Sequence, residues 1–280
     1  MYRLPLGTWV NQGVEWLLDC FGTAFDAFSD SVTVITDGLR SGLGAVPWWL
    51  LILLFAVLAW KAKGWRLALG TTVGLLIIYD MELWPPFLDT LILVIISALV
   101  SVLIGVPLGI LAAHSDRFHK ILFPILDFMQ TMPSFVYLIP ALMFFNLGTV
   151  SAIFATVIFA MPPAIRLTDL GIRQVPVDLV EVGEAFGSST GQLLWKIQLP
   201  LALPTIMAGV NQTMMLSLSM VVIAAMIGAE GLGAGVLAGI SQMDIGKGFE
   251  YGLAVVILAM ILDRMSQGVV GRKGIKAKKS

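Results

Sequence analysis

The sequence contains few residues of the kinds that form disulfides or bind metals. There is one cysteine, Cys20, in 280 residues, so an intramolecular disulfide is impossible, and there are two histidines, His114 and His119. We therefore expect no metal site in this chain. Charged residues make up only 12% of the chain, about half of the quarter usual in globular proteins. So few charges cannot cover a soluble protein of this size, which excludes a soluble enzyme. No basic patch lies within a region expected to fold, so nucleic acid is not an expected partner.

Apolar residues are abundant instead. Hydrophobic residues account for 58% of the chain, and there are 28 glycines besides. A bilayer core about 30 Å thick needs about 20 mostly apolar residues per helix. On this basis we predict an all-α integral membrane protein with about seven transmembrane helices. They cover Ala45–Trp60, Leu67–Tyr79, Leu88–Ala113, Ile121–Leu147, Thr149–Ile165, Leu201–Gly228 and Tyr251–Leu262, of which Leu67–Tyr79 is the shortest but one.

Lysines and arginines orient these helices. With the C-terminus in the cytoplasm, 14 of the 17 basic residues fall on the cytoplasmic side, and only Arg3, Arg40 and Lys247 fall outside. This matches the positive-inside rule. We therefore expect a multi-pass protein of the cell membrane, with the N-terminus outside and the C-terminus in the cytoplasm.

The first 44 residues differ from the rest. Apolar residues from Val14 to Leu39 recur at steps of three and four, which predicts one apolar stripe along a helix. Such a helix either lies in the outer interface or packs against the spans. We expect four regions: an extracytoplasmic amphipathic segment (1–44), additional N-terminal spans (45–84), a permease core (85–268) and a basic cytoplasmic tail (269–280). The tail is most simply an anchor to anionic headgroups.

The longest cytoplasmic stretch runs from Arg166 to Pro200. Asp178 is expected to cap a short helix, with Glu181 three residues later completing a capping box. The run from Gly187 to Gly191 should break this helix, and a second helix, 192–198, should lead into the next span. Two short helices joined by a glycine hinge would form a knob that can enter a groove on another protein.

The spacing within this stretch resembles a known pattern. Glu181, Gly187, Ile197, Leu199 and Pro200 fit E-x-x-x-x-x-G, nine residues, then I-x-L-P. This resembles the cytoplasmic "EAA" loop of ABC-importer permeases of type I. The chain departs from the family at Val182 and Gly183, where two alanines are usual. The resemblance implies a set of residues that couple to an ATPase: Glu181, Gly183, Glu184, Ala185, Gly187, Ile197, Leu199 and Pro200.

The resemblance extends from about residue 85 to 268. Segments 126–131, 163–168 and 199–220 are similar to the subgroup that imports glycine betaine, proline or choline-type osmolytes. It implies a pathway subunit without enzyme activity or cofactor of its own. Its partners would be a cytoplasmic ATPase that holds ATP and Mg, an extracytoplasmic substrate-binding protein, the bilayer, and a second copy in a homodimer. In agreement, the chain has no G-x-x-x-x-G-K-[ST] motif.

Several polar and aromatic residues could line a translocation path. Polar groups at hydrocarbon depth are costly and often face water. The candidates are Asp127, Gln130, Asn211 and Gln212, together with the aromatic pair Phe135 and Tyr137. Each has a second interpretation: Asp127 can reach the interface, amides can bond between helices, and aromatic rings can simply pack. Gly105-x-x-x-Gly109 and Gly70-x-x-x-Gly74 should allow close helix crossings.

Other interpretations stay open at this point. The glycine-rich stretch 230–248 is either a short re-entrant helix that receives the binding protein or a flexible loop. The chain could serve another small nutrient, act alone as an ion-coupled carrier or channel, or be a scaffold that transports nothing. An ion-coupled carrier would favour paired intramembrane charges, which are sparse here.

Overall fold

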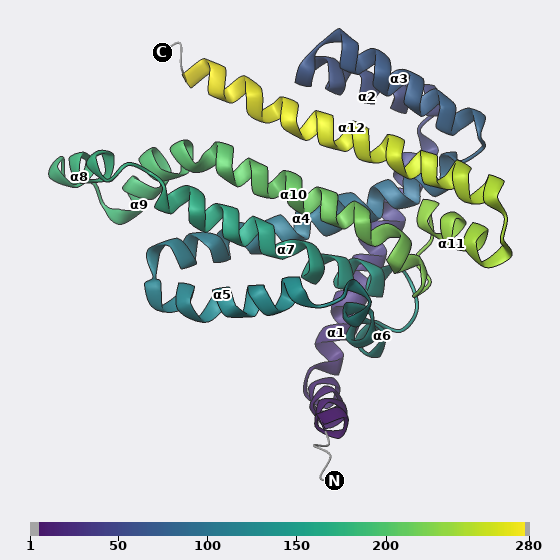
Figure 1. The fold of residues 1–280 in the computed structure, drawn as a ribbon, viewed down its shortest axis with the longest axis horizontal. Coiled ribbons are helices and arrows are strands. Elements are labelled where there is room, and N and C mark those ends of the chain that lie inside the picture. The colour runs from purple at the N-terminus through teal and green to yellow at the C-terminus, as the bar shows by residue number, and fades with distance from the viewer. Residues whose placement is uncertain (1–5, 278–280) are drawn as a thin grey trace.

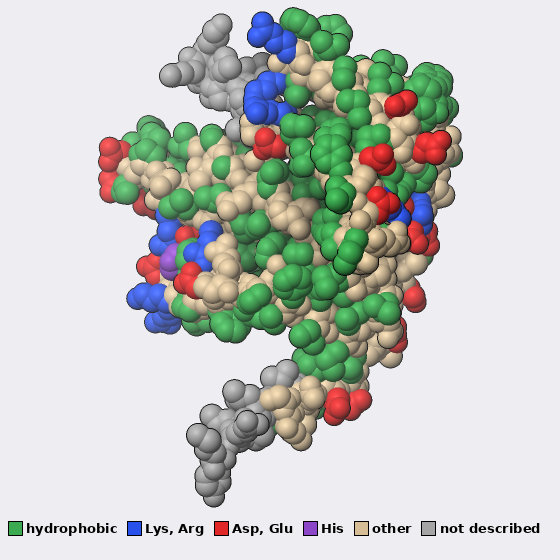
Figure 2. Space-filling view, turned by 45° about the vertical axis from the view of Figure 1, so that its right-hand side comes forward, with side chains coloured by type: hydrophobic (Ala, Val, Ile, Leu, Met, Phe, Trp, Pro, Cys, Tyr) green, Lys and Arg blue, Asp and Glu red, His purple; other side chains and the backbone are tan. Residues whose placement is uncertain are grey.

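The computed structural model describes residues 6–277. The predictions for Arg3 and for the side chains of the basic tail from residue 269 onward concern positions outside the described residues. All regular elements that the structure describes are helices, so the predicted all-α fold is confirmed. Figure 2 shows hydrophobic side chains spread over the whole visible face, with the largest groups of charged side chains near its edges.

The first helix, α1 (Leu6–Ala45), runs across the direction shared by α7, α10 and α12 and projects from the bundle (Figure 1). Its second half packs against α4, α6 and α7. Phe25 stacks on Phe144 with ring centroids 4.7 Å apart, and Arg40 pairs with Asp89 at 3.0 Å. Of the two arrangements expected for this helix, packing against the spans therefore describes its second half. Its first half leaves Trp16 61% exposed.

Helices α2 (Trp48–Lys63) and α3 (Trp65–Asp80) form a hairpin beside α12. Gly64 makes the turn with a φ of 98°, a conformation that favours glycine. At the other end of the hairpin, Trp48 stacks on Tyr79 with centroids 4.2 Å apart. Each helix has 16 residues, which gives a length of about 24 Å.

The core of the bundle is built from α4 (Trp84–His114), α7 (Thr149–Arg173) and α10 (Leu199–Ala225). Gly105 and Gly109 let α4 approach α7 closely, as their spacing predicts. A Cβ at Gly109 would lie 2.6 Å from the carbonyl oxygen of Ile165. Small residues at the crossing thus set the distance between these two helices.

The span predicted over 121–147 is broken in two. Helix α5 (Asp116–Thr131) is followed by a 3₁₀ turn, η1 (Ser134–Tyr137), and by α6 (Leu138–Phe145), and the two halves are bent by 109°. Met132, directly before Pro133, is extended with a ψ of 136°. A residue before proline is disfavoured in the helical region, which accounts for the break.

The last two helices are α11 (Leu232–Gln242) and α12 (Ile245–Ala277). The glycine-rich stretch is therefore largely helical rather than a flexible loop. Four described helices are long and apolar enough to cross a membrane on their own, and up to six if α1–α2 and α5–α6 each count as one span. Seven were expected. The difference includes α3, which is too short to qualify alone.

Candidate functional site

Two short helices project from one end of the bundle (Figure 1). They are α8 (Val177–Ala185) and α9 (Thr190–Leu193), and a π-helical turn, η2 (Leu194–Gln198), joins α9 to α10. We call residues 177–198 the knob. The α9–η2 segment runs into α10 as one apolar helical stretch of 36 residues. Leu199 and Pro200 therefore begin α10 without a break in the helical stretch, which connects the knob directly to a core helix.

The start of α8 differs from the predicted capping box. Pro176 occupies the N-cap, and no side chain caps the helix. Asp178 lies within the first turn, because Pro176, with φ −54° and ψ 128°, starts the helix earlier. The prediction that Asp178 caps the helix is wrong. A capping box exists instead at α9, where the Ser189 amide donates to Gln192 Oε1 at 2.9 Å and the Gln192 amide donates to Ser189 Oγ at 3.4 Å.

Gly187 ends α8 in a conformation that favours glycine. Its φ is +77°. The Gly187 amide donates to the Glu184 carbonyl at 2.8 Å, and the Ser188 amide donates to the Gly183 carbonyl at 3.0 Å. This pair of bonds is the Schellman arrangement, which satisfies the last carbonyls of a helix and needs a left-handed residue. Gly187 thus sets the direction of the chain between the two helices of the knob.

Gly183 holds the two helices of the knob together. It is buried, and a Cβ there would lie 2.5 Å from Leu193 Cδ2 and 2.8 Å from Ile197 Cδ1. Leu193 is only 4% exposed. The predicted coupling residues Gly183 and Ile197 are therefore in contact inside the knob. Glu181, Glu184 and Ala185 are exposed on its surface.

The outer surface of the knob exposes large apolar side chains and several acids. Phe186 is 88% exposed and Trp195 is 72% exposed. Val182 is also exposed, next to Glu181 and Glu184. Large aromatic side chains at the end of a projecting element are typical anchors of protein interfaces. The motif did not point to Phe186 or Trp195, because their exposure depends on how the knob folds.

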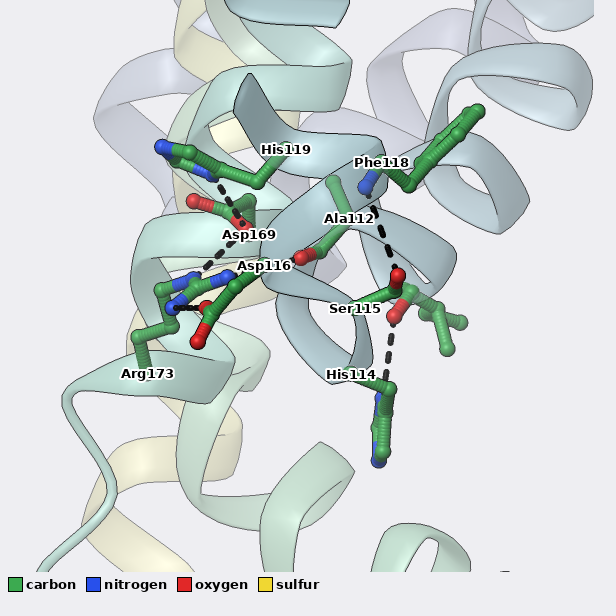
Figure 3. A network of polar contacts seen from close by, with 9 residues as sticks. Ala112, His114, Ser115, Asp116, Phe118, His119, Asp169 and Arg173 are labelled. Atoms are coloured by element: carbon green, nitrogen blue, oxygen red, sulfur yellow. Dashed lines mark hydrogen bonds and ion pairs between the residues drawn. The ribbon is translucent and has the colours of Figure 1, made fainter. Parts of the chain in front are cut away.

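Arg173 fixes α7 just before the knob (Figure 3). Its Nε donates to Asp169 Oδ1 at 2.9 Å, its Nη1 to Asp116 Oδ1 at 2.8 Å, and its Nη2 to the Ala112 carbonyl at 2.8 Å. His119 Nδ1 lies 3.2 Å from the same Asp169 oxygen. We call these residues the arginine cluster. It ties together the facing ends of α4, α5 and α7.

Asp169 is the buried centre of this cluster, only 3% exposed. A buried carboxylate without a charged partner is strongly destabilising. Arg173 supplies that charged partner from the same helix, four residues before α8 begins. Sequence reasoning missed this cluster. The sequence shows part of it, since Asp169 and Arg173 are four residues apart and Asp116 and His119 are three apart. Only the fold shows that the two helices carrying these pairs lie side by side.

The candidates for a translocation path on α5 and η1 are dispersed. Asp127 forms an ion pair with Arg166 of α7. Gln130 and Phe135 are exposed. Tyr137 is buried, donates its hydroxyl hydrogen to the Met129 carbonyl, and packs edge-on against Phe159 with centroids 5.9 Å apart. Phe135 and Tyr137 thus lie in different environments.

On α10, Asn211 and Gln212 also have different surroundings. Asn211 Nδ2 donates to Asp263 Oδ1 on α12 at 3.0 Å, and Asn211 Oδ1 accepts from the Ser266 hydroxyl. Gln212 is exposed. The second interpretation of such amides, bonding between helices, describes Asn211 in this structure.

Comparison with known proteins places this geometry in a family. Residues 105–272 match the model of the family described as binding-protein-dependent transport system inner membrane component. The glycine betaine transport system permease protein OpuAB of Bacillus subtilis is 49% identical over 97% of this chain and 96% of its own length. The glycine betaine/proline betaine transport system permease protein ProW of Escherichia coli is 48% identical over 95% of this chain and 75% of its own.

A solved structure agrees in fold. The MetNI methionine ABC transporter in an inward-facing conformation contains a chain with a TM-score of 0.62 and 21% identity, covering 66% of this chain and 93% of that one. At this identity the likeness concerns the fold alone. The family model and the two relatives together show that this chain belongs to the inner membrane components of binding-protein-dependent transport systems.

Proposed function

We propose that this chain is the permease subunit of an ATP-driven importer for a compatible solute, with glycine betaine first and proline- or choline-type osmolytes next. The observation that carries the proposal is a sequence identity of 49% to a glycine betaine permease protein over 96% of that protein's length. The knob adds support, since it is the element through which a separate cytoplasmic ATPase would drive such a subunit.

The knob docks on a separate cytoplasmic ATPase, which holds ATP and Mg, while this chain carries no cofactor. Phe186 and Trp195 supply apolar anchors, and Glu181 and Glu184 supply acidic contacts around them. Gly183, Ala185, Gly187, Ile197, Leu199 and Pro200 shape the knob and its junction with α10. Closure of the ATPase moves the knob as a rigid body, and α10 and α7 follow. This motion switches the path between its inward- and outward-open states.

A second copy of the chain completes the pathway in this proposal. Gln130, Phe135 and Gln212 are exposed, and a partner copy would turn that surface into a lined path. Asp127 and Tyr137 flank it, and Asn211 acts through the contact between α10 and α12. An extracytoplasmic binding protein delivers the solute at the end that carries α11.

The proposed orientation follows from the basic residues. Lys61 and Lys63 lie at the Gly64 turn, and Ala62 beside them contacts Gly268 towards the C-terminal end of α12. These lysines and the C-terminal end of α12 therefore lie on the same side of the membrane. If that side is the cytoplasm, the arrangement follows the positive-inside rule. The N-terminal segment (1–44) is then extracytoplasmic, followed by the additional spans (45–84), the core (85–268) and the cytoplasmic tail (269–280).

Uptake measurements in cells test the solute. The chain is expressed with its cognate ATPase and binding protein in a strain that lacks osmolyte uptake, and radiolabelled glycine betaine, proline, choline and methionine are compared. We expect betaine uptake that excess unlabelled betaine abolishes and methionine does not. Import of methionine but not of betaine would contradict the assigned solute class. No uptake of any solute by a correctly assembled complex would favour a scaffold.

A further inference from the structure

An apolar groove runs along one side of the molecule between α3 and α12. Its volume is about 350 Å³. Two glycines create it. A Cβ at Gly74 would lie 2.7 Å from Ile257, so Gly74 brings the helices together, whereas a Cβ at Gly70 would meet nothing within 4 Å. One turn of α3 thus makes the contact and the next leaves space. The groove is lined by Leu67, Gly70, Thr71, Val73, Gly74, Ile77, Ile257, Met260, Ile261 and Arg264.

One end of this groove is cationic. Arg264 lines it and is exposed, and it forms no hydrogen bond or ion pair with the part of the chain that the structure describes. Lys63 Nζ lies 3.4 Å from Gln267 Oε1, which places a second cation beside α12, one turn beyond Arg264. Arg66 is exposed in the first turn of α3. The nearby acid, Asp263, is already bonded to Asn211 and Gln267.

A polar atom inside the groove also lacks a partner. Thr71 is 1% exposed, and its hydroxyl finds no hydrogen-bond partner among the described residues. An unsatisfied buried hydroxyl is costly. Thr71 lies one helical turn beyond Leu67, further from the Gly64 turn. It is therefore a short distance deeper in the hydrocarbon than the cationic end of the groove. The protein itself covers this hydroxyl, so a lipid in the groove packs beside Thr71 without bonding to it.

The groove is too small to enclose a helix. A helix 10 Å wide beside the eleven residues from Leu67 to Ile77, about 16 Å long, would occupy about 1,300 Å³. The groove offers about 350 Å³. We propose that it binds one acyl chain of an anionic phospholipid, whose phosphate is held by Arg264 and by the basic turn between α2 and α3. Juxtamembrane basic residues attract anionic headgroups in general; here an apolar slot next to them adds selectivity for an individual lipid molecule.

Lipid retention tests this site. The assembled importer is extracted from membranes containing equal amounts of phosphatidylglycerol and phosphatidylcholine, and the lipids that remain bound are identified by native mass spectrometry. We expect the wild type to retain phosphatidylglycerol in preference. Arg264→Gln should lower that preference about fivefold, the effect of one basic residue at the headgroup. Gly70→Leu, which fills the groove, should abolish retention of this lipid.

Two matched variants control for charge and bulk. Arg117→Gln removes an exposed cation from α5, and Leu69→Phe enlarges an exposed side chain on α3 outside the groove lining; both should retain lipid like the wild type. Equal retention of both lipids by the wild type, or unchanged retention in Arg264→Gln, would overturn the proposal. A disulfide between two copies of the Gly70→Cys variant would also overturn it, because a second copy and not a lipid would then cover the groove. If Gly70→Leu does not fold, Arg264→Gln decides. Retention needs neither ATP nor solute, so its failure leaves the proposed function untouched.

Discussion

Replacing Gly187 should weaken binding of the ATPase by a calculable amount. The Schellman turn needs a left-handed residue here, and Gly187 has a φ of +77°. A residue with a Cβ pays about 1–2 kcal/mol in that conformation, and a β-branched one is the least tolerated. If the docked knob keeps this turn while the free knob of Gly187→Val relaxes, affinity for the ATPase falls about 5–30-fold. Gly187→Asn should fall less, because asparagine tolerates this region better.

Gly191 provides the matched control. It also has open space around its Cβ position, but it lies in α9 without a left-handed φ. Gly191→Val should therefore bind like the wild type. The assay titrates the purified ATPase onto the permease in nanodiscs and follows binding and stimulated ATP hydrolysis. Equal affinity of Gly187→Val and the wild type would refute the reasoning, as would an equal loss in both variants.

Three further perturbations address other parts of the site. Arg173→Gln leaves Asp169 buried without its main charge partner, at a cost of about 3 kcal/mol, so uptake per assembled complex should fall. Arg173→Lys should recover only part of that uptake. Full activity of Arg173→Gln would argue against a role for the arginine cluster. Phe186→Ala should reduce ATPase affinity about tenfold or more if this side chain is an interface anchor, and co-purification measures it. Asn211→Leu breaks the bond to Asp263 and should lower the melting temperature, about 2–4 °C for each kcal/mol lost, without changing KM for solute; a raised KM would place Asn211 in the path instead.

Local signals predicted the elements that local physics determines. The apolar runs of α4, α7 and α10 are long enough to specify helices by themselves, and the Gly105-x-x-x-Gly109 spacing predicted a close crossing that the structure confirms. The glycine at 187 was expected to break α8, and its left-handed φ explains why.

Features that depend on competition or on tertiary contacts were not predictable. Three prolines interrupt the span predicted over 121–147, yet Pro124 lies inside α5 and only Pro133 separates α5 from the next turn. Asp178 has the chemistry of a cap, but Pro176 starts the helix first. The arginine cluster joins residues 57 positions apart in sequence, Asp116 and Arg173, and no local pattern reveals which helices will meet.

The central claim is that a separate ATPase drives solute through this chain by way of the knob. Liposomes are prepared with the chain alone, with the chain and ATPase, and with both plus the binding protein, and radiolabelled betaine is followed with and without ATP. We predict accumulation only in the complete system with ATP, and its loss in Gly187→Val. Accumulation by the chain alone along an ion gradient would contradict the account.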